Sequence, residues 1–128
     1  MTNTFDGKRI LLVDDEEMVL TLGRVILERH GCTVMVATSG EEAVALCRET
    51  SDSPDCAIID YTMPGMNGRE TLLELRTIVP GLKAIVASGY GDDVIGQELG
   101  TVEVSGFVQK PYRQEALLSS LREVLCPA

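Results

Sequence analysis

Histidine is almost missing from this 128-residue sequence, and its four cysteines include no CxxC pair. Zinc sites are usually built from clusters of cysteine and histidine, so these scarcities argue against a zinc centre. We interpret the cysteines as small, reduced core residues, at positions Cys32, Cys47, Cys56 and Cys126. The single histidine, His30, precedes Gly31 at the end of a helical pattern, where a cation and then a glycine suit a helix C-terminus. The sequence around His30 shows no second catalytic group that would favour a phosphorylatable histidine.

Basic residues are also scarce, with 11 lysines and arginines against 20 aspartates and glutamates and a formal net charge of −9. Binding to nucleic acid or to an anionic membrane surface needs a basic patch. No apolar run approaches the roughly 18 residues of a membrane-spanning helix. The first residues, MTNTFDGKR, carry no apolar signal-peptide core. We therefore expect a soluble, cytoplasmic chain that contacts neither nucleic acid nor membrane directly.

The sequence does contain five short, β-branched apolar runs separated by segments with helical spacing. The runs are RILLV (9–13), TVMVA (33–37), CAIID (56–60), KAIVA (83–87) and GFVQ (106–109). Short runs without strict alternation are typical of strands buried on both faces. Strands that alternate with helices form a parallel sheet covered on both sides, and a chain of this length suits one such domain.

Apolar stripes predict which face of each helix is buried. The expected stripes are Met18, Leu22, Val25 and Ile26 with Arg29 at the edge; Leu72, Leu75 and Val79; and Leu117, Leu121, Val124 and Leu125. A fourth helix within 92–100 is expected to be weak, because Gly96 interrupts it and an interior glycine costs about 1 kcal/mol relative to alanine. We expect an N-terminal extension at 1–7, the domain at 8–125 and a C-terminal tail at 126–128.

Polar residues stand at the ends of four of these runs. Asp14 and Asp15 follow the first run, Asp60 ends the third, Ser88 follows the fourth and Lys110 follows the fifth. The carboxyl ends of parallel strands share one edge of a sheet, where ligands collect in open α/β folds. Two carboxylates 4 Å apart repel by about 4 kcal/mol at an effective dielectric of 20. A divalent cation that prefers oxygen ligands, Mg²⁺ or Mn²⁺, would relieve that repulsion.

The same residues predict a place for a phosphoryl group, because protein-bound Mg²⁺ commonly keeps a ligand position for a phosphate oxygen. If the strands are ordered 2-1-3-4-5, Asp60 lies between the acid pair and the Ser88–Lys110 pair. Aspartate is a known nucleophile in phosphoryl transfer. A phosphoryl group on Asp60 would accept a hydrogen bond from Ser88 and be neutralised by Lys110.

Each residue alone also has an ordinary structural interpretation. Asp15 can be only the N-cap of the first helix, with Glu16 and Glu17 favourable in its first turn. Ser88 before a glycine can be a turn residue, and Lys110 before a proline can belong to a simple loop. The joint occurrence at four strand ends is what favours a functional site.

Four motifs, VDDE (13–16), DYTMPGMNG (60–68), SGY (88–90) and KPY (110–112), occur in this order. Together, over about 8–125, they resemble the receiver domains of response regulators, the phosphoacceptor modules of two-component signalling. The resemblance implies an α/β fold, the (βα)5 flavodoxin-like three-layer sandwich. Its five-stranded parallel sheet has the order 2-1-3-4-5.

The resemblance also implies roles around the phosphorylation site, which it places at Asp60. The implied metal ligands are Asp14, Asp15 and Asp60 with the main-chain carbonyl of Thr62. Lys110 would bind the phosphoryl group, and the peptide between Lys110 and Pro111 is expected to be cis.

Three further residues would respond to the phosphoryl group or protect it. Ser88 stands where the family has threonine or serine. Phe107 stands at an aromatic switch position, where it lacks a hydroxyl and so must switch through ring packing. Thr62 and Tyr90 flank the path of an attacking water and are expected to tune the phosphoryl lifetime, with Tyr90 as a shield.

The resemblance implies a phosphohistidine donor, carried by a sensor histidine kinase or a histidine phosphotransfer protein. The implied output surface is the fourth helix, the fifth strand and the fifth helix. We expect a monomer or weak homodimer that phosphorylates itself as a signalling switch rather than an enzyme. The SGY and KPY segments favour the C-terminal receiver of a hybrid sensor histidine kinase over a stand-alone receiver.

Two other functions fit parts of the pattern. An aspartate-nucleophile phosphatase on a related fold would carry Asp-x-Asp after its first strand, whereas Asp14, Asp15 and Glu16 stand there in this sequence. A pseudo-receiver, a binding module without the chemistry, would lack part of the site, which is complete here. Reaction with acetyl phosphate or BeF₃⁻ in the presence of Mg²⁺ distinguishes these alternatives from a receiver.

Overall fold

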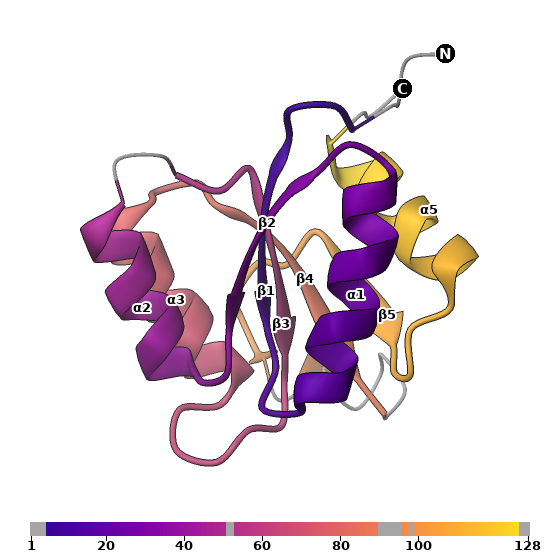
Figure 1. Cartoon of the computed structure of the whole chain (residues 1–128). Helices are drawn as coiled ribbons and strands as arrows, with labels where there is room; N and C mark the ends of the chain where they lie inside the picture. The colour runs from indigo at the N-terminus through magenta and orange to yellow at the C-terminus, as the bar shows by residue number, and fades with distance from the viewer. Residues whose placement is uncertain (1–4, 51–52, 90–95, 98, 126–128) are drawn as a thin grey trace.

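The computed structural model describes residues 5–50, 53–89, 96–97 and 99–125 (Figure 1). Within these residues the elements are β1 (Arg9–Val13), α1 (Glu17–Arg29), β2 (Thr33–Ala37), α2 (Gly40–Glu49), β3 (Cys56–Asp60), α3 (Gly68–Ile78), β4 (Lys83–Ser88), β5 (Gly106–Gln109) and α5 (Gln114–Leu125). Every helix in this part of the chain is too short or too polar to cross a membrane. The five predicted strands are confirmed, and β4 extends one residue further than predicted, to Ser88.

The five strands form one parallel sheet in the order β2-β1-β3-β4-β5, which confirms the expected fold class. Leu12 in β1 pairs with Val36 in β2 and with Ile58 in β3. Helices α1 and α5 cover one face of the sheet, and α2 and α3 cover the other (Figure 1). This arrangement brings the carboxyl ends of all five strands to one edge, as expected for a parallel sheet with crossover helices.

The core has two halves because side chains of a strand alternate between the two faces of a sheet. Ile10 and Leu12 point into the cluster beneath α1 and α5, while Leu11 and Val13 point into the cluster beneath α2 and α3. Strands β1, β3 and β4 are buried almost throughout, as predicted. The prediction is wrong for β2 and β5, which are only partly buried because each lies at an edge of the sheet.

The buried face of α1 differs from the predicted stripe. Met18, Leu22 and Val25 are 86%, 42% and 45% exposed. The residues that face the sheet are Leu20, Gly23, Ile26 and Leu27. Gly23 explains the difference, since a Cβ there would lie 2.8 Å from Leu12 Cδ2 and 3.3 Å from Tyr112 Cε2. The helix therefore approaches the sheet through its glycine, a contact that apolar periodicity does not reveal.

The other stripes and the end of α1 follow the predictions more closely. Leu72 and Leu75 of α3, and Leu117, Leu121 and Val124 of α5, are buried. His30 caps the C-terminus of α1, and Gly31 follows it with a φ of 92°. The ring Nδ1 of His30 lies 2.9 Å from the Ile26 carbonyl oxygen. The interpretation of His30 as a helix-end residue is thus confirmed.

The described cysteines are free and buried, as expected for core residues, at positions Cys32, Cys47 and Cys56. Burial raises the pKa of the Cys32 thiol to about 11 and that of Cys56 to about 12. These thiols are therefore protonated and poor nucleophiles near neutral pH. Cys126 lies outside the described residues.

The loop after β3 is fixed at both ends. Its first residue, Tyr61, accepts a hydrogen bond from the Gly68 N–H at 2.8 Å through its carbonyl. A Cβ on Gly68 would lie 2.8 Å from Tyr61 Cα, so only glycine allows this approach. Asn67 and Glu70 form a capping box at the start of α3. The loop consequently returns over the end of β3, beside Asp60.

Two predicted segments lie largely outside the described residues. In the predicted fourth helix, 92–100, Gly96, Gln97 and Leu99 are helical. Leu99 is buried against Tyr61 and Val86 in a third, smaller cluster, on which Phe107 also packs. In the predicted N-terminal extension, 1–7, Phe5 is 1% exposed and joins the core cluster beneath α1 and α5. Phe5 stands outside every apolar run and helical stripe of the sequence, so the predicted elements do not reveal this anchor.

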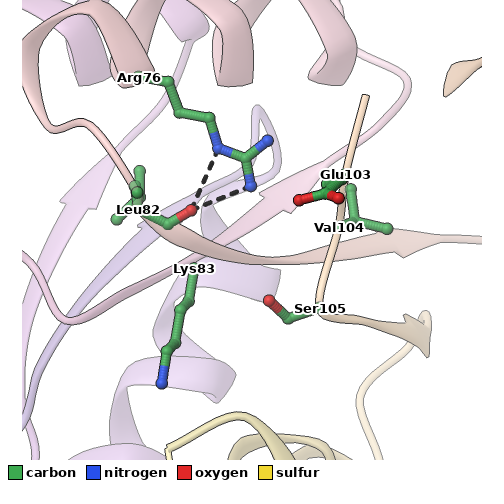
Figure 2. A pocket seen from close by; sticks show the side chains of 7 residues that line it. Arg76, Leu82, Lys83, Glu103, Val104 and Ser105 are labelled. Atoms are coloured by element: carbon green, nitrogen blue, oxygen red, sulfur yellow. Dashed lines mark hydrogen bonds between the residues drawn. The ribbon is translucent and has the colours of Figure 1, made fainter. Parts of the chain in front are cut away.

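A groove of about 580 Å³ lies at the amino ends of β4 and β5, opposite the edge that carries the predicted site (Figure 2). Arg76 reaches over it and donates from Nε and Nη2 to the Leu82 carbonyl oxygen, at 3.2 and 3.0 Å. Lys83 donates from Nζ to the Val124 carbonyl oxygen at 3.0 Å. Both cations are therefore bound to the main chain, where they hold α3 and α5 against the start of β4.

Candidate functional site

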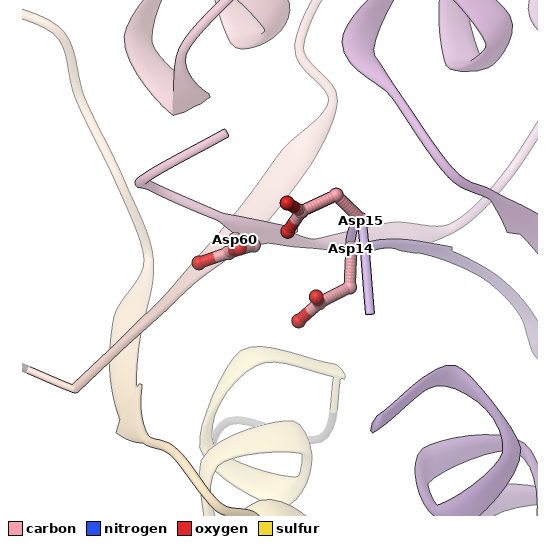
Figure 3. Close-up of side chains that lie close together, drawn as sticks. All are labelled: Asp14, Asp15 and Asp60. Carbon is pink, nitrogen blue, oxygen red and sulfur yellow. The ribbon is translucent and has the colours of Figure 1, made fainter. Parts of the chain in front are cut away.

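The three predicted acids lie together at the carboxyl edge of the sheet (Figure 3). Val13 and Ile59 are paired in the sheet, so the residues that follow them, Asp14 and Asp60, are neighbours across β1 and β3. One carboxylate oxygen from each of Asp14, Asp15 and Asp60 lies within 4.8 Å of the others. Asp14 is fully buried and Asp60 is 2% exposed, while Asp15 is exposed.

Main-chain hydrogen bonds continue the sheet ladder to this edge and fix the site residues. Asp14 donates its N–H to the Ala37 carbonyl at 3.1 Å, and Tyr61 donates to the Ala87 carbonyl at 2.9 Å. Lys110 donates its N–H to the Ser88 carbonyl at 2.9 Å. The main chain at each of these site residues is therefore hydrogen-bonded to at least one neighbouring strand.

Lys110 supplies the positive charge among the acids. Its Nζ lies 3.0 Å from Asp14 Oδ2, 3.2 Å from Asp60 Oδ2 and 3.4 Å from Glu16 Oε1. Burial favours the neutral amine and lowers the pKa of Lys110. The hydrogen bond to Asp14 and the charges of Asp60 and Asp14 outweigh that effect and raise the pKa to about 12. Lys110 is therefore a permanent cation of the site.

Burial raises the pKa of Asp60 to about 6, and the negative charge of Asp14 adds to the increase. Lys110 and the Thr62 N–H, 3.4 Å from Asp60 Oδ1, act in the opposite direction. Burial also raises the pKa of Asp14, against the Glu16 N–H and Lys110, which lower it. The fold thus concentrates negative charge that a single ammonium does not fully offset.

Ser88, Pro111 and Phe107 occupy the remaining described positions of the predicted site. Ser88 is the last residue of β4 and is 5% exposed. It lies one residue beyond Ala87, the sheet partner of Asp60. The Lys110–Pro111 peptide is cis. Phe107, in β5, is partly buried against the cluster of Tyr61, Val86 and Leu99.

Thr62 is exposed, and its main-chain N–H lies 3.4 Å from Asp60 Oδ1. Tyr90, the other residue predicted to affect phosphoryl lifetime, lies outside the described residues. The structure therefore brings together the acids, Ser88, Lys110 and Thr62.

Glu16 is a site residue that sequence reasoning missed. The sequence predicts that Glu16 stands at the start of the first helix, which is correct, but it does not predict a contact with the site. In the structure Glu16 is the N-cap of α1, without a side-chain capping hydrogen bond, and its carboxylate contacts Lys110 instead. The available signal was its position directly after Asp14 and Asp15, because a third acid there extends the same charged cluster.

The donor set suits a hard divalent cation. Three carboxylates converge, two of them buried, and among the described residues no histidine or cysteine belongs to the cluster. Such all-oxygen sites favour Mg²⁺ or Mn²⁺. The acidic cluster can therefore hold a metal ion, whose charge would offset the carboxylate repulsion.

A family model described as the response regulator receiver domain matches residues 10–122. The chain belongs to this family. It is a receiver domain of a two-component system, and receiver domains serve these systems as phosphoacceptor switches.

Curated relatives and solved structures agree with the assignment. The receiver domain is 36% identical over 124 residues to the sensor kinase CckA of Brucella abortus, covering 97% of this chain and 13% of that protein. It is 34% identical to the chemotaxis protein CheY of Thermotoga maritima, covering 92% of this chain and 98% of CheY. The crystal structure of the receiver domain from the hybrid histidine kinase CckA superimposes with a TM-score of 0.77. The two share 29% identity, and the match covers 91% of this chain and 98% of that one.

Proposed function

We propose that Asp60 accepts a phosphoryl group from a phosphohistidine of a sensor histidine kinase or of a histidine phosphotransfer protein. The observation that carries the proposal is that Asp60 has both other carboxylates and an ammonium beside it. One carboxylate oxygen of each of Asp14 and Asp15 lies within 4.8 Å of an Asp60 oxygen, and the Lys110 ammonium lies 3.2 Å from Asp60 Oδ2 and 3.0 Å from Asp14 Oδ2. Asp60 is also the member of this cluster whose strand pairs with β4, the strand that ends at Ser88.

In the proposed reaction, a carboxylate oxygen of Asp60 attacks the phosphorus of the phosphohistidine. A P–O bond to Asp60 forms as the P–N bond breaks, and the departing imidazole keeps the electron pair and takes a proton from solvent. Lys110 neutralises one oxygen of the transferred group, and the Ser88 hydroxyl donates a hydrogen bond to another. A divalent cation held by Asp14, Asp15, Asp60 and the Thr62 carbonyl would supply charge neutralisation.

An exposed apolar stripe next to the site supports a helical phosphodonor. Met18, Leu22 and Val25 occupy i, i+4 and i+7 of α1, so they form one face that begins at the edge carrying Asp60. A donor that presents its histidine on a helix could pack on this stripe while the histidine reaches Asp60. Leu22→Ser is expected to slow transfer from a CckA-type kinase about tenfold and leave acetyl phosphate reactivity unchanged. Leu73→Ser, on α3 and 43% exposed, is the matched control.

Phosphorylation is proposed to change the surface of the fourth helix, β5 and α5. Tyr61 directly follows Asp60 and packs with Leu99 and Phe107, so the phosphoacceptor is one residue from the cluster beneath that surface. Thr62 and Tyr90 are proposed to tune the lifetime of the phosphoryl group. We further propose a cytoplasmic domain at 8–125, a monomer or weak homodimer, and a source in a hybrid sensor histidine kinase.

The deciding experiment is incubation with acetyl phosphate and Mg²⁺, followed by intact-protein mass spectrometry. The parent is expected to gain the mass of one phosphoryl group, and Asp60→Ala is expected to gain none. A pseudo-receiver would form no adduct in either protein. An aspartate phosphatase would release inorganic phosphate from small phosphate esters in steady turnover. An undiminished adduct in Asp60→Ala would move the phosphoacceptor to another residue.

A further inference from the structure

The ammonium of Lys110 has three N–H donors, and three carboxylate oxygens surround it. Two belong to the buried acids Asp14 and Asp60, at 3.0 and 3.2 Å, and the third belongs to Glu16, at 3.4 Å. The side chain of Glu16 is 64% exposed, against 0% for Asp14 and 3% for Asp60. Glu16 is therefore the outermost of the three partners.

The backbone of Glu16 is fixed by the same site. Its N–H donates to Asp14 Oδ1 at 2.9 Å, and its carbonyl accepts the N–H groups of Val19 and Leu20, both at 3.1 Å. The Glu16 side chain makes no capping hydrogen bond in α1. Its carboxylate is thus available to Lys110 from a backbone position that depends on Asp14.

We infer that Glu16 is a positioning residue that holds the Lys110 ammonium at the outer side of the site, where a phosphoryl group on Asp60 must lie. This inference rests on the proposed function. Because Asp60 is buried, a phosphoryl group on its carboxylate has to extend toward the exposed edge. To follow it, Lys110 must give up its contact with the Asp60 carboxylate and move outward. Glu16, the outermost partner, can stay in contact with the ammonium during that movement.

Without the Glu16 charge, the two buried carboxylates draw the ammonium inward. Lys110 would then neutralise the phosphoryl group less well. Exposed ion pairs contribute little individually, so the expected weakening is modest, about three- to five-fold in affinity for a phosphoryl analogue. Glu17 provides a matched control, because it is the next residue, is exposed and carries the same charge in the first turn of α1.

The first test uses the metal-free protein and the NMR signal of the Lys110 side-chain ammonium, assigned by its absence in Lys110→Met. Glu16→Gln is expected to shift this signal, and Glu17→Gln is expected to leave it in place. An equal response to both substitutions would show only a general charge effect and would overturn the inference.

The second test is titration with BeF₃⁻ in the presence of saturating Mg²⁺. Affinity is expected to fall about three- to five-fold in Glu16→Gln and to stay within about 1.5-fold of the parent in Glu17→Gln. In a Lys110→Met background, Glu16→Gln is expected to have no further effect. A weakening that persists in that background would mean that Glu16 acts through the metal or through α1, which contradicts a role in positioning Lys110.

If the parent binds BeF₃⁻ and Asp60→Ala does not, while Glu16→Gln matches the parent, the proposed function stands and the inference about Glu16 is wrong. If the parent itself forms no adduct, the proposed function fails and the inference falls with it.

Discussion

The two ends of the sheet hold their cations in different ways. At the carboxyl end, Lys110 is shared among the carboxylates of Asp14, Asp60 and Glu16. At the amino end, Arg76 and Lys83 donate to main-chain carbonyls, and Figure 2 shows the Glu103 carboxylate facing Arg76 across the groove. The sheet thus carries cations at both ends, but their partners have different chemistry.

A main-chain carbonyl cannot be protonated near neutral pH, bind a phosphoryl group or leave its place in the fold. A carboxylate can lose its charge to a proton, share it with a metal or, as proposed for Asp60, be phosphorylated. The amino end is therefore a fixed junction between α3, α5 and β4. The carboxyl end is a set of charges that can be redistributed, and the fold tolerates its internal repulsion at some loss of stability.

Lys110→Met is expected to have the largest effect on stability, because it leaves two buried carboxylates without their cation. Breaking such a pair destabilises proteins by about 3–5 kcal/mol. We expect about 3 kcal/mol near pH 7.5 in urea denaturation of the metal-free protein, given that Asp60 can take up a proton. Below the Asp60 pKa of about 6, one of the two charges is neutralised and the loss should shrink. A loss that stays constant with pH would show that Lys110 acts mainly through packing.

Asp60→Asn is expected to raise stability in the metal-free protein. Burial raises the pKa of Asp60 from 3.8 to about 6, so the folded state binds its proton more tightly than the unfolded state does. Stability contributed by that proton is complete below the unfolded pKa and is lost as pH rises through about 6. Two pKa units correspond to about 3 kcal/mol, and we expect a gain of about 2 kcal/mol near pH 7.5 that vanishes near pH 4.

The control for this gain is Asp55→Asn at the other end of β3. Asp55 Oδ2 accepts the Arg9 N–H at 2.8 Å on the exposed surface, so its replacement should slightly weaken the protein. Equal stability changes in Asp60→Asn and Asp55→Asn, measured by urea denaturation in EDTA, would contradict the view that the carboxyl end stores repulsion.

The sequence predicts most of the carboxyl end of the sheet and little of the amino end. Strand ends marked by Asp14, Asp60, Ser88 and Lys110 were predictable because each polar residue interrupts an apolar run. The amino end gave no comparable signal. Arg76 and Lys83 donate to main-chain carbonyls. Because every residue has such a carbonyl, the sequence does not mark which ones act as acceptors.

The errors in α1 have a related cause. Met18, Leu22 and Val25 form a regular apolar stripe, but the helix packs on the sheet at Gly23. The close approach there is possible because glycine has no side chain. The Glu16–Lys110 contact was missed because it joins residues 94 positions apart through side-chain geometry. Hydrophobic periodicity predicts helices and strands well. When a helix carries two apolar stripes, close packing decides which stripe is buried.

Asp15→Asn is expected to separate the metal site from the rest of the charged edge. Asp15 is exposed, so its neutralisation should change stability little, yet it removes one of three converging carboxylates. Loss of a metal ligand should weaken Mg²⁺ binding by at least about tenfold and slow phosphorylation by acetyl phosphate at limiting Mg²⁺. Isothermal titration with Mg²⁺ measures the first effect, and Glu17→Gln should reproduce neither. If Asp15→Asn and Glu17→Gln weakened Mg²⁺ binding equally, Asp15 would contribute only its negative charge and would not be a metal ligand.

Lys83→Met should give the smallest change and completes the comparison with Lys110→Met. The substitution removes one hydrogen bond from an ammonium to the Val124 carbonyl. We expect a loss of about 1 kcal/mol that is the same near pH 5 and pH 8, because its acceptor does not titrate. BeF₃⁻ affinity should be unchanged. If Lys83→Met instead lost stability with the pH dependence of Lys110→Met, or weakened BeF₃⁻ binding, the two ends of the sheet would be electrostatically coupled, and the amino end could no longer be regarded as a fixed junction.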